Sequence, residues 1–176
     1  MRIFYIIIAM HITQNKYPVF EFSKESNIGN WKVVDDVVMG GVSSGKFDLD
    51  EKGAGKFYGN VSLENNGGFS SLQYAFETIE IANFTSIVLE VKGDGKDYQF
   101  RVKDKINNAH SYIYPFSTND KWQTIVIPLK EMYPALRGRK LAIGNFNSET
   151  IAQIAFLIGN KRNEEFQLLI KGIDLK

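Results

Sequence analysis

Apolar and polar residues alternate in short segments along most of the chain from Val19 onward. Successive side chains of a β-strand point to opposite faces, so this alternation is typical of strands with one buried and one exposed face. It recurs in residues 20–22, 47–49, 57–63, 72–76, 87–91 and 98–103, and less regularly in 110–116, 122–129, 154–158 and 166–175. Helical periodicity is nearly absent, so the pattern predicts an all-β domain.

Residues that favour tight turns separate the expected strands. Segments 51–53, 65–68 and 93–95 combine glycine with asparagine, aspartate or lysine, and such segments accept the positive φ of tight turns. Among them, Gly93-Asp94-Gly95 predicts a hairpin most clearly. Residues 130–141 contain Pro134 and Gly138, which predicts a loop with a short helical turn.

Residues 19–176 contain no linker, internal repeat or change of composition, which predicts a single domain. Many short strands in one domain need two sheets, so we expect a two-sheet jelly-roll sandwich. The first strand, residues 19–22, is expected to lie beside the last, residues 166–171, because this closure hides sheet edges.

Residues 1–18 are expected to form a leader or a disordered start. Arg2 and the apolar run from Ile3 to Met10 resemble a short secretory signal peptide, and the alternative is a strand or a disordered start. The run is too short to cross a membrane as a helix. The sequence leaves a cytoplasmic and an exported location open and predicts no transmembrane segment.

Opposite charges almost cancel over the whole chain. There are 21 Lys and Arg against 20 Asp and Glu, a formal net charge of +1, so no general field attracts nucleic acid and no such partner is expected. There is no cysteine, and there are only two histidines. This composition excludes thiolate metal ligands, a cysteine nucleophile and a histidine-based zinc cluster. No metal site, cofactor or catalytic residue is predicted.

Two segments are unusual for plain β structure. They form the motif Asp35, Asp36, Met39, Gly40 and Gly41, and the motif Asn65, Asn66, Gly67 and Gly68. Aspartates often accept hydrogen bonds from the N–H groups of turns, so we expect the motifs to lie together, with at least one aspartate bonded to backbone. The alternative is a cation site or an acid–base pair, but adjacent residues of an extended chain point to opposite sides.

With the segment Gly93–Arg101, these motifs resemble the complex I intermediate-associated protein family, and the resemblance runs from about Val19 to the C-terminus. It implies a galactose-binding-like jelly roll and, in mitochondria, a chaperone role in assembling respiratory complex I. It implies no established active site. The family commonly carries an arginine where this chain has Gln73.

Alternation also predicts a binding surface. If Tyr98, Phe100 and Val102 fill the core, the side chains between and after them project together from the opposite face. The expected surface consists of Gln73, Gln99, Arg101, Lys103, Tyr112 and Trp122. The alternative is a solvated face on which Arg101 pairs with Asp97 or Asp104.

The sequence therefore favours a non-enzymatic assembly factor or scaffold that binds a protein, and a subunit of a membrane complex is a candidate partner. The alternative is a carbohydrate-binding module of the galactose-binding-like class. In that case the rings of Tyr112, Tyr114 and Trp122 would stack on sugars, and Asn60, Gln99 and Arg101 would bond to hydroxyl groups. A glycosidase is a weaker third possibility, since no pair of carboxylates can be placed face to face.

Overall fold

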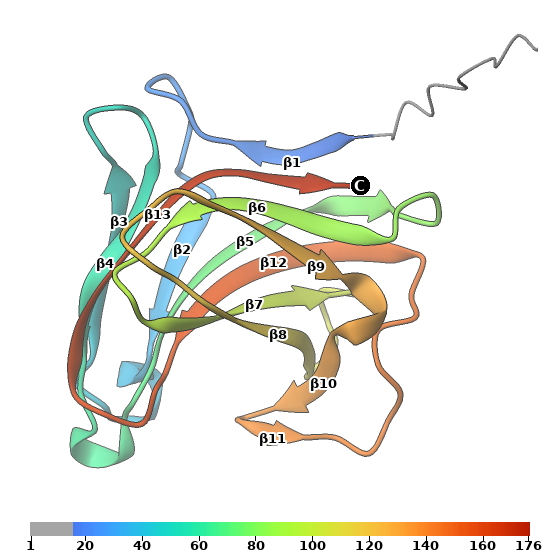
Figure 1. Cartoon of the computed structure of the whole chain (residues 1–176). Helices are drawn as coiled ribbons and strands as arrows, with labels where there is room; N and C mark the ends of the chain where they lie inside the picture. The colour runs from blue at the N-terminus through green and yellow to red at the C-terminus, as the bar shows by residue number, and fades with distance from the viewer. Residues whose placement is uncertain (1–15) are drawn as a thin grey trace, which may run out of the picture.

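Alternating apolar side chains arrange the chain as strands of two antiparallel sheets that pack face to face (Figure 1). The computed structural model describes residues 16–176, so the leader expected at residues 1–18 lies almost wholly outside the described residues. The prediction of a two-sheet jelly-roll sandwich is confirmed. Within residues 16–176, no helix is long and apolar enough to cross a membrane.

The first sheet, which we call sheet A, follows the order β3-β4-β13-β6-β9, with β1 added beside β13. Its strands are β1 (Tyr17–Glu21), β3 (Ser44–Leu49), β4 (Gly55–Val61), β6 (Ser86–Lys92), β9 (Gln123–Pro128) and β13 (Glu164–Leu175). The predicted pairing of the first and last strands is confirmed, but β1 lies against the end of β13, with Tyr17 opposite Leu175 and Glu21 opposite Gly172. The start of β13 pairs with β4 instead.

The second sheet, which we call sheet B, follows the order β11-β10-β8-β7-β12-β5-β2. Its strands are β2 (Trp31–Asp35), β5 (Ser70–Glu80), β7 (Asp97–Lys103), β8 (Ser111–Ser117), β10 (Tyr133–Leu136), β11 (Arg139–Lys140) and β12 (Thr150–Ile158). Three short 3-10 turns complete the structure: η1 (Asp36–Met39), η2 (Glu64–Asn66) and η3 (Leu129–Glu131).

The prediction of a hairpin at Gly93-Asp94-Gly95 is wrong. The turn joins β6 of sheet A to β7 of sheet B, and these strands do not pair with each other. Gly95 has the expected positive φ of 82°. However, a Cβ at Gly93 would lie 2.2 Å from Oγ1 of Thr118, so the chain passes close to the end of β8 as it crosses between sheets. A local turn signal cannot report which sheet receives the next strand.

The prediction of a loop with a short helical turn at residues 130–141 is partly wrong. The short helical turn exists as η3, but the residues after it form β10 and β11, which extend sheet B beyond β8 (Figure 1). Pro134 is compatible with this position, since a proline is tolerated in short strands near a sheet edge. Arg137 and Gly138, both with positive φ, make the turn between the two strands.

The core lies between the sheets and consists of the inward side chains of both. Phe57, Phe100, Phe156, Leu168 and Ile170 are all fully buried. β12 is buried on both faces, as its unbroken apolar sequence predicts, because its outward side chains at positions 155 and 157 are only 6% and 7% exposed. The strands' inward residues therefore fix the fold and leave the outward ones free for other chemistry.

Adjacent residues of β7 should differ sharply in their effect on stability. Phe100→Ala removes a fully buried ring and should lower the free energy of unfolding by about 3–5 kcal/mol. Gln99→Ala, one position away on the outward face, leaves the core intact and removes only the hydrogen bonds from Arg101, so it should cost about 1–2 kcal/mol. Urea unfolding followed by fluorescence measures both, and equal losses would contradict the assignment of the two faces.

Candidate functional site

A buried carboxylate holds the two glycine-rich motifs together. Asp36 is 0% exposed, and its Oδ2 accepts hydrogen bonds from the backbone N–H groups of Gly68 at 2.6 Å and Phe69 at 3.2 Å. Its Oδ1 accepts from the N–H of Ser43 at 3.0 Å, and the Ser43 hydroxyl donates to Oδ2. The prediction that an aspartate joins these segments through backbone N–H groups is confirmed.

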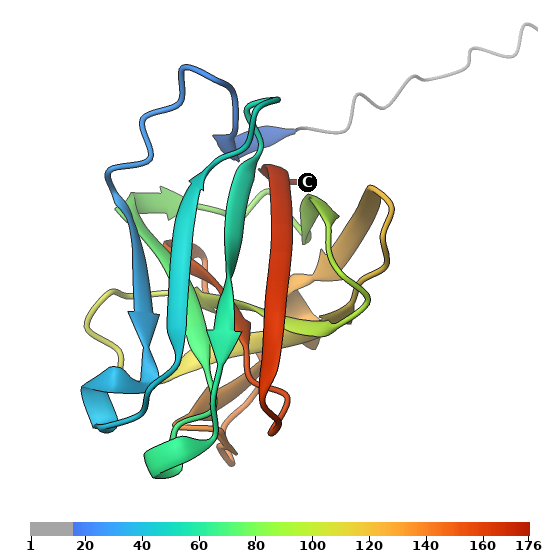
Figure 2. The ribbon, with the colours of Figure 1, turned by 90° about the vertical axis from the view of Figure 1, so that its left-hand side faces the viewer.

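Glycine is required around this carboxylate. A Cβ at Gly41 would lie 2.3 Å from Oδ1 of Asp36, and a Cβ at Gly67 would lie 2.5 Å from Oδ2. Gly40 and Gly68 have φ values of 91° and 132°, which side chains rarely tolerate. The glycines of the two motifs thus allow backbone to close around one charge, at the end of the sandwich where η1 and η2 lie (Figures 1 and 2).

The neighbouring carboxylate makes a second link. Oδ2 of Asp35 accepts from the N–H of Gly45 on β3 at 2.9 Å, and the Ser70 hydroxyl of β5 donates to its Oδ1. Asp35 therefore joins sheet A to sheet B. Asn65 and Asn66 adopt positive φ in η2, and Met39 is exposed, so these three residues shape the loops without bonding to either carboxylate.

Hydrogen bonding, rather than burial, decides the ionisation of Asp36. Burial would raise the pKa of this carboxyl, but the donors of Ser43, Gly68 and Phe69 together hold it below its usual value. Asp36 is therefore an anion at neutral pH. Each of its oxygens already has at least one donor, so the carboxylate acts in the structure as a brace between loops.

The outward face of sheet B carries the predicted polar strand. Gln99, Arg101 and Lys103 project away from the core, because Tyr98, Phe100 and Val102 of the same strand are at most 1% exposed. Gln73 lies on this face as well. It is opposite Ala155 of β12, which in turn is opposite Arg101 of β7. Four of the six expected surface residues are therefore neighbours.

Arg101 is half-buried and has no acidic partner among the described residues. Its Nε and Nη2 both donate to Oε1 of Gln99, at 3.1 and 2.6 Å. The ion pairs expected in the alternative do not form, since Asp97 accepts from Ser117 and Asp104 accepts from Asn108. Burial lowers the pKa of Arg101 from its usual value, but the guanidinium remains charged at neutral pH.

Sequence reasoning missed several members of this face, because they come from strands whose pairing no local pattern reveals. Lys32 of β2 lies opposite Gln73, and Tyr133 of β10 lies opposite Ile113, the neighbour of Arg101. Nζ of Lys140 on β11 lies 5.2 Å from the centroid of the Tyr133 ring. Together we call these residues the basic face: Lys32, Gln73, Gln99, Arg101, Lys103, Tyr133, Lys140 and Gln153. Its charged members are all cations, and the nearest acid on the same side of β7 is Asp97, at the start of the strand, which accepts a hydrogen bond from Ser117.

Tyr112 and Trp122 do not belong to the basic face, although both were expected there. Tyr112 is opposite the buried Val102 and packs against the ring of Phe146, with centroids 5.0 Å apart, so it lies on the core side of sheet B. Burial raises the pKa of its hydroxyl. Trp122 precedes β9 and borders the outer surface of sheet A. Alternation within one strand correctly predicted that Arg101 projects outward. It could not predict on which face the aromatic residues of other segments lie.

Residues 20–170 match the sequence pattern of the protein family described as "Complex I intermediate-associated protein 30 (CIA30)". The chain belongs to this family. The match begins in β1 and ends within β13, so it includes both glycine-rich motifs and the basic face. A comparison with curated protein sequences found no match.

Solved structures share the jelly roll of this CIA30 family member at low sequence identity. A family 11 carbohydrate-binding module from Clostridium thermocellum, in complex with a β-1,3-1,4-mixed-linked tetrasaccharide, has a TM-score of 0.69 and 18% identity over 91% of this chain and 94% of its own. A family 29 carbohydrate-binding module has a TM-score of 0.53 and 10% identity, covering 92% of this chain and 91% of its own. An exo-β-agarase has a TM-score of 0.59 and 13% identity over 90% of this chain but 25% of its own.

The family match therefore assigns the chain to CIA30, and the solved structures show its jelly-roll fold. Within residues 16–176, no group of three or more acidic or histidine side chains is arranged to hold a metal ion. His110 packs edge-on against the ring of Tyr112. In this CIA30 chain, the most unusual chemistry outside the loops is therefore the unpaired guanidinium of Arg101.

Replacing Asp36 tests the brace. Asp36→Asn puts an N–H₂ group among backbone donors, and we expect the free energy of unfolding at pH 7 to fall by about 3 kcal/mol. The folded pKa of Asp36 lies below its usual 3.8, so its ionic contribution is full above that value and is lost as the pH falls through the folded pKa. The difference between the two proteins should therefore shrink below pH 3.8.

The measurement is urea unfolding at neutral and at acidic pH. Asp120→Asn is the matched control, because Asp120 is exposed and makes no hydrogen bond within the described residues. If Asp36→Asn cost no more than this control at pH 7, the carboxylate would not be the brace.

Proposed function

We propose that this protein is a non-enzymatic assembly factor that docks on an acidic surface of a partner protein through the basic face of sheet B. A subunit of a membrane complex is a partner that would fit the family. Family membership supports the assembly role. The cations of the basic face support the proposal that the partner docks there and that its surface is acidic.

The observation that carries this proposal is that the guanidinium of Arg101 is half-buried without an acidic partner. A half-buried guanidinium has lost part of its hydration, yet in the described part of the chain its only hydrogen-bond partner is the neutral amide of Gln99. A carboxylate of a partner would restore a charge-assisted, two-pronged interaction that the free protein lacks. Arginine in such a position is often an anchor of a protein interface.

Apolar side chains pack beside this anchor. Ile113, Ala155 and Leu157 occupy outward positions next to Arg101 and Gln99 and are at most 7% exposed, so neighbouring side chains already cover them. Lys32, Lys103 and Lys140 lie farther out. Cations at the rim of an interface steer association with an acidic partner.

Carbohydrate binding is the second candidate function, and the fold of the carbohydrate-binding modules favours it. On the basic face, however, the aromatic side chain available is Tyr133, at the margin. The other residues that the carbohydrate hypothesis uses lie elsewhere: Tyr112 and Tyr114 pack against the core, and Asn60 and Trp122 lie at sheet A. The basic face itself therefore suits an acidic protein better than a neutral sugar.

Removing or reversing a positive charge on the basic face should weaken binding of the partner. Tagged protein is used to capture partners from native lysate, each partner is identified, and its affinity is then measured in purified form against the variants. We expect Arg101→Gln and Lys103→Glu each to reduce affinity about ten-fold or more, and the affinity of the unaltered protein to fall as salt is raised.

Lys24→Glu is the matched control, because Lys24 is an exposed lysine outside the basic face. Thermal unfolding checks that each variant folds. Equal affinity of the Lys24 and Lys103 variants, or no loss with Arg101→Gln, would contradict docking through the basic face.

A further inference from the structure

The outer face of sheet A carries a second surface with a different chemistry. Two hollows, of about 490 and 480 Å³, lie next to each other there and share Gln167 as a common lining residue. Tyr58, Asn60 and Glu165 line the first, and Lys56, Leu169 and Trp122 line the second. We call the two hollows together the sheet A groove. Each is within the size range of small-ligand sites, about 300–1,000 Å³.

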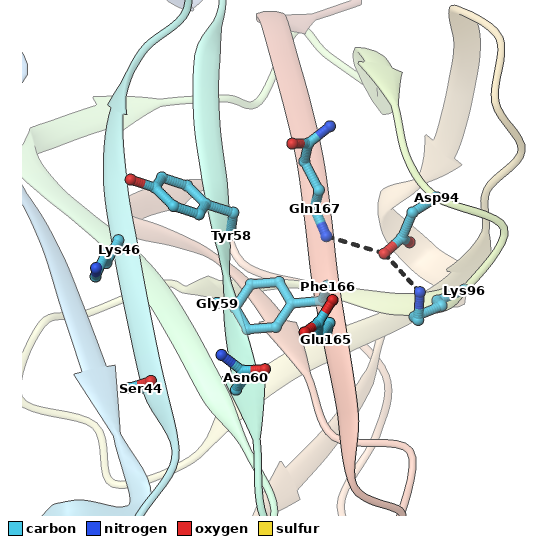
Figure 3. Close-up of a pocket in the computed structure, with 10 residues that line it drawn as sticks. All are labelled: Ser44, Lys46, Tyr58, Gly59, Asn60, Asp94, Lys96, Glu165, Phe166 and Gln167. Atoms are coloured by element: carbon cyan, nitrogen blue, oxygen red, sulfur yellow. Dashed lines mark hydrogen bonds and ion pairs between the residues drawn. The ribbon is translucent and has the colours of Figure 1, made fainter.

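Strand register makes β13 the floor of this groove. Asn60 of β4 lies opposite Glu165, and Tyr58 lies opposite Gln167. One step further along, Leu169 lies between Lys56 of β4 and Lys92 of β6. The outward side chains of β13 thus follow one another along the groove. Figure 3 shows Tyr58 and Gln167 on neighbouring strands, with Asp94 and Lys96 on the far side of β13.

The ring of Tyr58 extends from β4 over β3, on one side of this floor (Figure 3). Its hydroxyl donates to Oδ2 of Asp48 at 3.0 Å, which raises the pKa of Tyr58 and keeps the hydroxyl protonated. Nζ of Lys56 lies 4.5 Å from the ring centroid. Lys56 does not border the first hollow, whereas Tyr58 and Asn60 do, so the first hollow meets the ring on the side away from Lys56.

The opposite wall is also fixed. Oδ2 of Asp94 accepts hydrogen bonds from the backbone N–H of Gln167 at 2.9 Å and from Nζ of Lys96 at 2.8 Å (Figure 3). Its Oδ1 accepts from the buried hydroxyl of Tyr98 at 3.0 Å. The turn between the sheets is thereby tied to β13. The walls are therefore already in place before any ligand arrives, which lowers the entropic cost of binding.

Trp122 adds a second aromatic surface at the other end of the groove. Its side chain is 45% exposed and borders the second hollow together with Lys92 and Leu169. A tryptophan ring offers a large apolar face and a polar N–H, a combination that is common at ligand surfaces. Tyr58 and Trp122 thus offer stacking surface in both hollows.

The polar groups between them suit a neutral ligand rich in hydroxyls. The side chains of Asn60, Glu165 and Gln167 make no hydrogen bond within residues 16–176, so their donors and acceptors remain available. Lys96 is paired with Asp94. The other charges are mixed, with Lys46 and Glu165 in the first hollow and Asp48, Asp50, Glu51, Lys52, Lys56 and Lys92 in the second, so neither sign of charge prevails. Aromatic rings stack on the C–H faces of pyranoses, while amides and carboxylates bond to the hydroxyl groups at their edges.

We propose that the sheet A groove binds a β-linked oligosaccharide. Equatorial linkages give an extended chain with flat faces, which can follow the straight row of outward side chains on β13 past both aromatic residues. An α-linked chain curves and would leave one of the two hollows. The basic face shares no residue with this groove, so the proposal is independent of protein docking through Arg101.

Calorimetric titration of the full chain tests the proposal with two β-linked probes and one α-linked probe. The β-linked probes are the mixed-linked β-1,3-1,4-glucan tetrasaccharide and cellotetraose, and maltotetraose is the α-linked comparison. Trp122 supplies a second readout. The chain has two tryptophans, and Trp31 is buried, so a change in emission on binding reports mainly on Trp122.

We expect at least one β-linked probe to bind more tightly than maltotetraose. Tyr58→Ala and Trp122→Ala should each weaken that binding about ten-fold or more, as is usual for aromatic anchors. Tyr58→Phe keeps the ring and should retain most of the affinity. Tyr133→Ala and Arg101→Gln, on the basic face, are the matched controls and should leave the affinity unchanged. Thermal unfolding verifies that each variant folds.

Three results would overturn the proposal. The first is that no β-linked probe binds at millimolar concentration. The second is that maltotetraose binds as well as they do. The third is that Arg101→Gln or Tyr133→Ala abolishes binding while Tyr58→Ala does not, which would place a sugar site on the basic face. None of these results bears on capture of a protein partner through the basic face.

Discussion

The pair of aspartates at the end of β2 is the interaction on which this end of the sandwich depends. Asp36 gathers donors from the segments that precede β3 and β5, while Asp35 bonds directly to β3 and β5. β3 belongs to sheet A, whereas β2 and β5 belong to sheet B. Because a buried charge without partners is very costly, the sheets cannot separate here without a large penalty. Two carboxylates therefore act as a non-covalent link in a chain without cysteine.

Because this link and the core hold the sheets together, the outward side chains of both sheets are not needed for that contact. The inward side chains of β4, β7, β12 and β13 already fill the core, and the loops at this end are held by Asp35 and Asp36. The outward positions therefore differ between the sheets. Sheet B gathers cations around Arg101, and sheet A places Tyr58 and Trp122 among polar groups of both charges. One jelly roll can thus present two chemically different surfaces.

Residues whose role follows from neighbours in sequence could be predicted, and residues whose role follows from strand pairing could not. Alternation placed Phe100 inside and Arg101 outside, and the aspartate and glycine motifs predicted a braced pair of loops. By contrast, Gly93-Asp94-Gly95 carries the residues of a hairpin yet joins different sheets. Trp122 lies on sheet A only because β9 pairs with β6, and Tyr133 reaches the basic face only because β10 pairs with β8. The alternation in residues 57–63 is consistent with an outward Tyr58, but its neighbour Gln167 comes from a strand far along the chain.

The two surfaces also differ in how they could act together. The basic face and the sheet A groove lie on opposite sides of the sandwich and share no residue, and separate sites of this kind contribute almost additively to binding. A partner that offered an acidic protein surface near a glycan could therefore engage both sides through two copies of the protein, or one side through a single copy. Salt would weaken the first contact and leave the second almost unchanged, because ionic screening acts on charge pairs and not on stacking. The salt dependence of binding thus identifies which side of the sandwich holds a given partner.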